Sequence, residues 1–325
     1  MSWGWSPRLN LFRDDPIVWR TFGLAVGIFV FSVTAALVIG NDTEVPVIVS
    51  AAEVAGVLAA IALIRALQVK AFASIQLAPT LSSIAAQGRG ILDDLYPQPD
   101  PADRPGAAPL PPLLRAVTWP RRQAILQQLN LRRLLEAADG AVIVLRARIG
   151  DTLQEGVVVA DLHGGDASDA AVLGALVTGQ ERTFHQDPLF AFRLLADIGL
   201  RALSPAVNDP ATGVQVLDTV EGLLAPLVAR DLDVAEIVHD AGAVKVVLAL
   251  PAWDDYLRIA LDDLIESGAR SPMVLLRARA LLTGLQNAAP PQRRSSITWR
   301  LHRAEELVAG NFPEIWRHAT GGDPA

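Results

Sequence analysis

The stretch from Gln180 to Thr212 holds the residue types best suited to chemistry in this 325-residue chain. Arg193, Asp197 and Arg201 are spaced four residues apart in an otherwise apolar run, so on a helix they stack along one face. Charges on such a face pair with one another or donate hydrogen bonds to an anion. Six polar residues flank the run and could join the same site: Arg182, Gln186, Asp187, Ser204, Asn208 and Asp209.

Two helices are expected to position these side chains. Asp187 is followed by proline, which is typical of a helix that starts with an N-capping carboxylate and has proline in its first turn. This helix should end at Ser204, because Pro205 disfavours helical geometry in the residue before it. A second helix is expected to begin in the same way at Asp209, which is also followed by proline.

Three interpretations of this polar face stay open. The first is a structural network that fixes helix packing and the Asp209 cap, since buried charges need partners. The second is a ligand or anion pocket in which Arg182, Arg193 and Arg201 donate hydrogen bonds. The third is a contact between subunits.

The common enzymatic motifs are not evident in the sequence. Ser204 has no adjacent histidine, and no G-x-S-x-G elbow surrounds it. The five histidines are scattered, there are no cysteines, and no glycine-rich phosphate loop occurs, so we predict no metal site and can name no cofactor. The balance of motifs is against an enzyme, and a net charge of −7 argues against a nucleic-acid binder.

The first 70 residues have the composition of a membrane segment. Residues 21–40 contain no charge and reach the roughly 20 residues needed to cross a bilayer as a helix. Residues 45–64 form a second such segment, broken only by Glu53. Basic residues lie at the outer ends of this expected hairpin, at Arg8, Arg13, Arg20, Arg65 and Lys70. The positive-inside rule then places both ends of the hairpin in the cytoplasm.

Three residues in these expected spans attract attention. An acid within a bilayer is costly, so Glu53 is either part of an ion or proton path or a protonated group bonded to a neighbouring helix. Gly23 and Gly27 make a G-x-x-x-G pair, which allows close helix packing within the hairpin or between copies of the chain.

The polar stretch resembles the signature of a bacterial family of predicted membrane proteins, domain of unknown function 2254. The matching runs are Arg182-Thr183, Gln186-Asp187-Pro188, Arg201-Ala202-Leu203-Ser204-Pro205 and Asn208-Asp209-Pro210. Ser6-Pro7-Arg8 and Phe12-Arg13-Asp14 resemble a family segment that usually follows two earlier spans, which are absent here. The resemblance implies a bacterial inner-membrane, multi-pass protein, either a short member or a chain with an internal start, and it implies no assigned activity.

The predicted fold class is an α+β membrane protein: a transmembrane helical hairpin (residues 1–70) followed by a mostly helical cytoplasmic domain with a few short strands. Residues 71–112 are expected to form a juxtamembrane helix and a proline-rich linker, and residues 113–325 the domain. Within it, helices are predicted at 123–138, 168–177, 187–204, 210–230, 253–267, 271–286 and 293–308, and strands at 141–148, 156–161, 235–239 and 244–250.

The function favoured by these patterns is an oligomeric channel- or transporter-like assembly regulated by its cytoplasmic domain. Two spans enclose no pore, so this function requires a homo-oligomer. One alternative is a membrane-anchored ligand-sensing domain or enzyme, and another is a scaffold for other membrane proteins. The expected partners are the lipid bilayer, further copies of the chain, and a small molecule or ion that the sequence does not identify.

Overall fold

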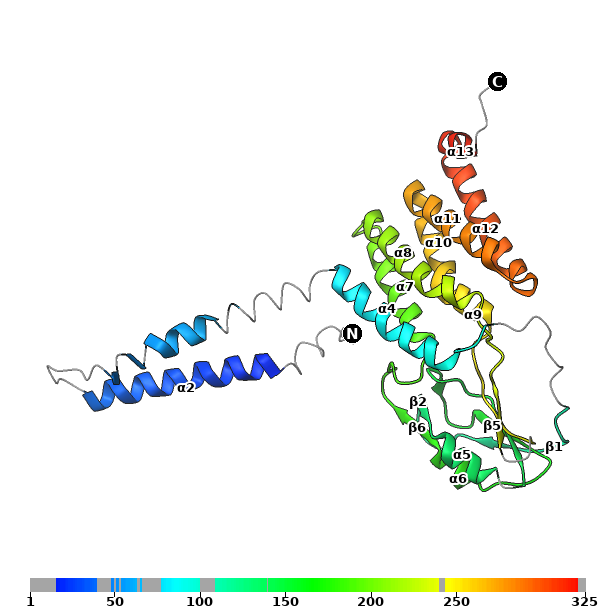
Figure 1. The fold of residues 1–325 in the computed structure, drawn as a ribbon, viewed down its shortest axis with the longest axis horizontal. Helices are drawn as coiled ribbons and strands as arrows, with labels where there is room; N and C mark the ends of the chain where they lie inside the picture. The colour runs from blue at the N-terminus through cyan, green and yellow to red at the C-terminus, as the bar shows by residue number, and fades with distance from the viewer. Residues whose placement is uncertain are drawn as a thin grey trace. The chain divides into compact units, whose positions relative to one another are not determined.

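A computed structural model gives the fold of the chain (Figure 1). It describes residues 16–39, 48–49, 51–52, 54–62, 65, 77–99, 109–138, 140–239 and 243–320. The chain divides into two compact units, Met1–Thr80 and Leu81–Ala325.

The first unit contains α2, which runs from Pro16 to Ile39 and exposes apolar side chains such as Phe29, Val30 and Leu37. Further helical residues follow at 48–49, 51–52, 54–62 and 65. Among them Gly56 lies against Ile28 of α2, because a Cβ added to it would be 3.4 Å from the Ile28 Cγ1 atom. Added Cβ atoms at Gly23 and Gly27 would meet no described atom within 4 Å. Close packing at these two glycines within the hairpin is therefore not seen among the described residues, and their packing between copies of the chain stays a prediction. Glu53 lies outside the described residues.

The predicted transmembrane helical hairpin is wrong for the described part of the chain. No described helix combines the length and the apolar character that crossing a membrane requires. The predicted multi-pass topology and orientation of the termini stay predictions.

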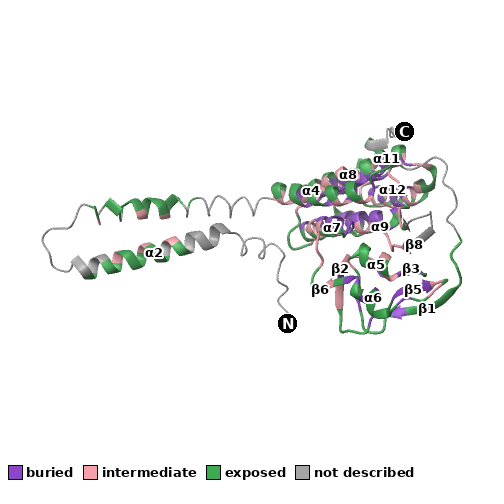
Figure 2. Cartoon of the chain, turned by 60° about the horizontal axis from the view of Figure 1, so that its bottom comes forward, coloured by how far each residue is buried: buried purple, intermediate pink, exposed green. Residues whose placement is uncertain are grey.

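The second unit has a helical part, in which the helices pack their buried faces against one another. Its helices are α4 (Leu77–Leu95, in this unit from residue 81), α7 (Phe190–Leu203), α8 (Pro210–Leu227), α9 (Trp253–Leu257), α10 (Asp263–Ser267), α11 (Pro272–Ala288), α12 (Pro291–Asn311) and α13 (Pro313–Thr320). Figure 2 shows buried residues where α7, α8, α9 and α11 meet. Gly88 lets α4 approach α7 and α8 closely, since a Cβ there would lie 2.5 Å from the Ala191 Cβ atom.

A helix cap and a π-helical turn are two local features that shape the helical part. Asp209 caps α8 by accepting a hydrogen bond from the Thr212 backbone N–H at 3.1 Å, as predicted. Between α9 and α10 the helix widens into a π-helical turn, Arg258–Asp262. One carboxylate on each side of the turn, Asp254 before it and Asp262 at its end, binds the same buried side chain, Arg300 of α12.

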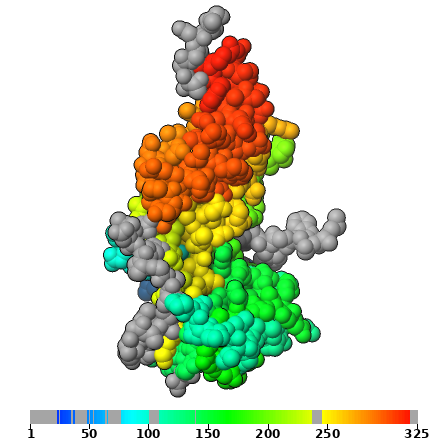
Figure 3. Space-filling view, turned by 90° about the vertical axis from the view of Figure 1, so that its right-hand side faces the viewer, coloured from blue at the N-terminus to red at the C-terminus, as the bar shows by residue number. Residues whose placement is uncertain are grey.

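The strand part of the second unit contains two sheets. In the space-filling view of Figure 3, the teal and green residues lie below the yellow-to-red residues of the helical part. The larger has the order β1-β5-β3-β8-β7, with β3 and β8 parallel and the other pairs antiparallel; the smaller has the order β4-β2-β6. The elements are β1 (Leu113–Thr118), β2 (Ala124–Leu129), α5 (Leu131–Ala137), β3 (Val142–Leu145), β4 (Thr152–Leu153), β5 (Val158–His163), α6 (Asp169–Gly174), β6 (Leu176–Gly179), β7 (Glu236–His239) and β8 (Ala243–Val247).

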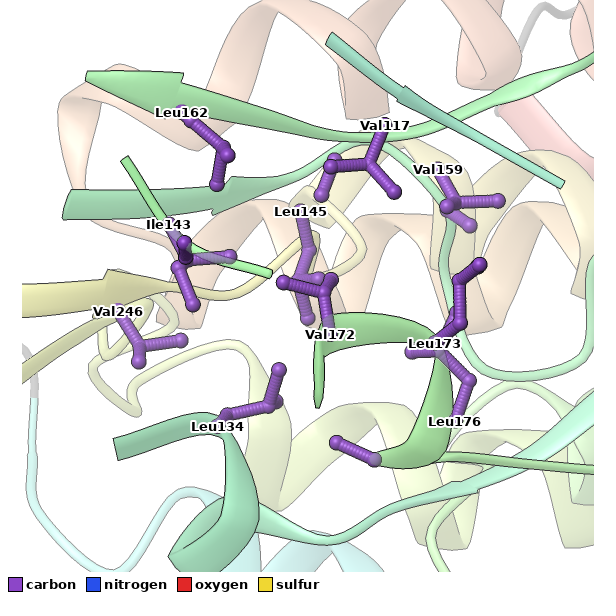
Figure 4. Close-up of a cluster of buried hydrophobic side chains, with 14 of the residues drawn as sticks. Val117, Leu134, Ile143, Leu145, Val159, Leu162, Val172, Leu173, Leu176 and Val246 are labelled. Carbon is purple, nitrogen blue, oxygen red and sulfur yellow. The ribbon is translucent and has the colours of Figure 1, made fainter. Parts of the chain in front are cut away.

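A hydrophobic cluster holds this part together. Figure 4 shows side chains from strands β1, β3, β5, β6 and β8 and from α5 and α6 converging on one core. Leu134, Ile143, Val159, Leu162 and Val246 are fully buried there. Because β8 follows α8 in the chain and pairs with β3, the strand part is completed by a segment that returns from the helical part.

The predicted helix over residues 123–138 is wrong in its first half. Residues 124–129 form β2, which pairs with both β4 and β6, and the helix begins only at Leu131. Asn130 starts it, because its side chain accepts a hydrogen bond from the Arg133 backbone N–H. Similarly, the predicted helix 168–177 ends at Gly174 and the chain continues as strand β6.

Candidate functional site

The loop that precedes α7 is anchored by a buried ion pair. The Asp187 side chain is 1% exposed and accepts hydrogen bonds from Arg182 Nε at 2.7 Å and Nη2 at 2.8 Å. The guanidinium of Arg182 also lies over the Phe190 ring. The helix itself begins two residues later than predicted, with Leu189 at the cap position in place of Asp187. Asp187 therefore pairs with Arg182 instead of capping α7 in the usual way, and it also accepts the Leu189 N–H.

The same loop is fastened to the strand part at three points. Gln127 of β2 donates a hydrogen bond to the Glu181 carbonyl at 2.6 Å. The Gln186 side-chain oxygen accepts one from the Leu129 backbone N–H at 2.8 Å. The Arg182–Asp187 pair packs on Gly150, which has a positive φ of 92°. We call residues 181–188 the signature loop.

Gly150 gives a direct test of this anchoring. A Cβ at this position would lie 2.5 Å from Asp187 Oδ2 and 2.7 Å from Arg182 Nη2. We expect Gly150→Ala to destabilise the protein by about 2 kcal/mol, through the clash and the strained φ. Thermal unfolding should report a midpoint lower by roughly 4–8 °C.

Gly156→Ala is the matched control for Gly150→Ala. Gly156 also has a positive φ, 83°, but a Cβ there would meet no described atom within 4 Å. It should therefore carry the backbone cost alone and unfold at a higher temperature than Gly150→Ala. Equal midpoints for the two variants would show that contact with the ion pair contributes nothing.

The remaining predicted site residues lie along α7 and at the turn into α8. Arg193 and Asp197 form an ion pair at 2.9 Å, with side chains 47% and 46% exposed. Ser204 ends α7 and its hydroxyl donates to the Arg201 carbonyl at 2.7 Å. Exposed Asn208 takes a left-handed conformation, with a φ of 47°, and Asp209 caps α8. Their contacts fix helix ends and an exposed helix face.

A cavity of about 370 Å³ lies beside the signature loop. Its apolar lining comes from four further segments of the second unit: Ile91, Leu95, Leu129, Leu131, Ile149, Leu248, Ala249, Leu250 and Pro251, with Pro188 from the loop itself. Four polar residues share the lining: Asp94, Arg148, His185 and Gln186. A concave, mostly apolar cavity with a few polar groups is the usual form of a small-molecule site.

Arg148 is held in the cavity wall by a carboxylate from the helical part. Its Nη1 atom donates to Asp255 Oδ2 at 2.7 Å, and Arg258 donates to the other oxygen at 3.0 Å. Burial raises the pKa of the Asp255 carboxyl, but hydrogen bonds from Arg258, the Ala252 N–H and Arg148 outweigh it and hold that pKa below its usual value. Two guanidinium groups thus share one carboxylate, which leaves net positive charge beside the cavity.

The sequence alone singled out Gln186 of the cavity lining but missed Asp94, Arg148 and residues 248–251. These residues come from segments far apart in the chain, and no local spacing relates them. No group of three or more histidine, aspartate or glutamate side chains suited to a metal ion occurs within the described residues.

Comparison with known proteins places the chain among uncharacterised relatives. A family model described as "Predicted membrane protein (DUF2254)" matches residues 1–284. The chain is 31% identical over 236 residues to Uncharacterized protein Rv1290c of Mycobacterium tuberculosis and to Uncharacterized protein Mb1321c of Mycobacterium bovis. Each match covers 69% of this chain and 45% of the relative, so the chain spans about half the length of these proteins. No solved structure matches it.

Proposed function

The chain belongs to the DUF2254 family of predicted membrane proteins, and from this premise we propose that its second unit is a ligand-sensing domain. The observation that carries the proposal is the cavity beside the signature loop, which is lined by the loop residues His185, Gln186 and Pro188. The loop's buried anchor, Asp187, then serves to hold one wall of a binding site. The ligand would be small and mainly apolar, because ten of the fourteen lining residues are apolar.

The first unit fits a role in attachment to a membrane. Its described residues expose apolar side chains on α2 and over residues 54–61, including Phe29, Leu37, Leu58 and Ile61. Contact of these side chains with lipid would bring the sensing unit to the membrane surface. The channel- or transporter-like assembly favoured from the sequence required two membrane spans in each chain, and no feature of the described residues favours it. Self-association stays a prediction.

Binding of an apolar dye to the full chain tests the proposal. N-phenyl-1-naphthylamine is neutral and fluoresces strongly in apolar sites, and we expect wild type to bind it. Ala249→Phe fills the cavity from its wall and should weaken that binding at least tenfold, about 1.4 kcal/mol. Ala211→Phe, on the exposed first turn of α8, is the matched control and should bind dye as wild type does.

A second variant guards against misfolding of Ala249→Phe. Leu131→Trp enlarges a different, partly exposed wall residue at the start of α5 and should also weaken dye binding. Dye that binds to exposed apolar residues of α2 gives the same background in every variant. If both wall variants unfold at the wild-type temperature and still bind the dye as tightly as Ala211→Phe, the cavity is not a ligand site.

A further inference from the structure

Two of the four polar residues in the cavity lining, Arg148 and Gln186, can donate hydrogen bonds to an occupant. The Gln186 oxygen already accepts the Leu129 N–H, which fixes the orientation of the amide and leaves its NH₂ group as a donor for a ligand. Arg148 has five N–H donors on its guanidinium, and its hydrogen bond to Asp255 uses one nitrogen, Nη1. Both side chains therefore offer hydrogen-bond donors to an occupant.

The charge around Arg148 adds to this preference. Asp255 is shared between Arg148 and Arg258, so the three groups together carry one positive charge. A carboxylate or similar oxyanion next to Arg148 would gain both that charge and hydrogen bonds of the charge-assisted kind. Asp94, the acid in the lining, is exposed on α4 and would repel such an anion weakly.

The rest of the lining indicates the chemistry of the part of the ligand that lies away from Arg148. Apart from the His185 ring, the lining that is not charged or amide consists of aliphatic and proline side chains, which suit an apolar chain better than a flat nucleobase. Its volume lies near the small end of the ~300–1,000 Å³ typical of ligand pockets. An unbranched aliphatic chain meets both conditions.

Resting on the ligand-sensing role proposed above, we propose that the cavity binds a single-chain amphiphile with an anionic head. Arg148 and the Gln186 NH₂ group hold the head, and the chain lies against Leu129, Leu248 and Leu250. A medium-chain carboxylate has this chemistry.

Three compounds with one chain length and different heads test the assignment: decanoate, decanol and decyltrimethylammonium. Each displaces N-phenyl-1-naphthylamine from the full chain, measured below its micelle concentration. We expect decanoate to displace the dye at a concentration at least tenfold lower than decanol, and decyltrimethylammonium to displace it least. Asp94→Asn should strengthen decanoate binding about twofold, by removing the repulsion.

Gln186→Glu is the decisive variant. It keeps an oxygen to accept the Leu129 N–H, so the signature loop retains its tie to β2, but it replaces the donor NH₂ group with a negative charge. Decanoate should lose its advantage over decanol. Arg148→Lys, which keeps the charge and can still pair with Asp255, should retain most of the preference.

Two failures are distinguishable. If the dye binds in a manner that Ala249→Phe abolishes, but decanoate and decanol displace it equally, or decyltrimethylammonium displaces it best, the anionic head is wrong and the ligand-sensing proposal stands. If the dye shows no binding that depends on Ala249, the proposed function fails and this inference fails with it.

Discussion

Replacing Asp187 with alanine is expected to destabilise the protein by about 3 kcal/mol, because it leaves the Arg182 guanidinium without its partner at a mostly buried position. The Arg182 side chain is only 23% exposed, so water can replace the lost carboxylate only in part. For a unit of this size, the midpoint of thermal unfolding should fall by roughly 6–12 °C. Dye binding in the cavity should weaken as well, because residues 185–188 lose their anchor.

Asp197→Ala is the matched control for Asp187→Ala. It removes the same chemical group from a second arginine–aspartate pair, but both side chains there are about half exposed on α7. Exposed pairs contribute roughly 0–1 kcal/mol, so the unfolding midpoint should shift little and dye binding should be unchanged. Similar losses of stability in the two variants would show that burial of the Arg182–Asp187 pair has no energetic weight.

Replacing Arg300 with methionine should have an effect of similar size on the helical part. The Arg300 side chain is 4% exposed and donates to Asp262 through Nε at 2.5 Å and Nη2 at 3.1 Å, and to Asp254 through Nη1 at 2.7 Å. Methionine keeps the apolar stem but leaves both carboxylates unpaired, so we expect a loss of about 3 kcal/mol. Urea unfolding, followed by circular dichroism, should show the lower midpoint.

Arg303→Met tests whether burial causes that loss. Arg303 lies one turn further along α12 and binds Glu266 through two hydrogen bonds, at 2.6 Å and 2.9 Å. Its side chain and that of Glu266 are substantially exposed, so the expected cost is below about 1 kcal/mol. If Arg303→Met proves as costly as Arg300→Met, two hydrogen bonds to a carboxylate matter more than removal from water.

Where local signals decided the structure, the sequence was sufficient. The Asp209 cap and its following proline begin α8, and Ser204 before Pro205 ends α7, as predicted. Strands β3, β5, β7 and β8 lie within or close to their predicted ranges. These features depend on residues within a few positions of one another, so each can be recognised without knowledge of the rest of the fold.

Where distant residues decided the structure, the sequence was insufficient. Asp187 has the local pattern of a cap, but Arg182 and the backbone of Gly150 give it a buried ion pair instead. Residues 124–129 have a helical distribution of leucines, but strands on both sides make them β2. The cavity joins five segments between residues 91 and 251, and no spacing rule links them.

The π-helical turn Arg258–Asp262 has a consequence for how this molecule tolerates change in length. In a regular α-helix, two residues eight positions apart are offset by about 80° around the axis. Asp254 and Asp262 have that separation, but both reach one guanidinium, because the wider turn between them takes up the offset. The π-helical turn contains one residue more than an α-helical turn, and this extra residue brings the two carboxylates to the same side of the helix. Removing one residue there would return the helix to regular α-helical geometry, and Arg300 of α12 would then bind one carboxylate instead of two.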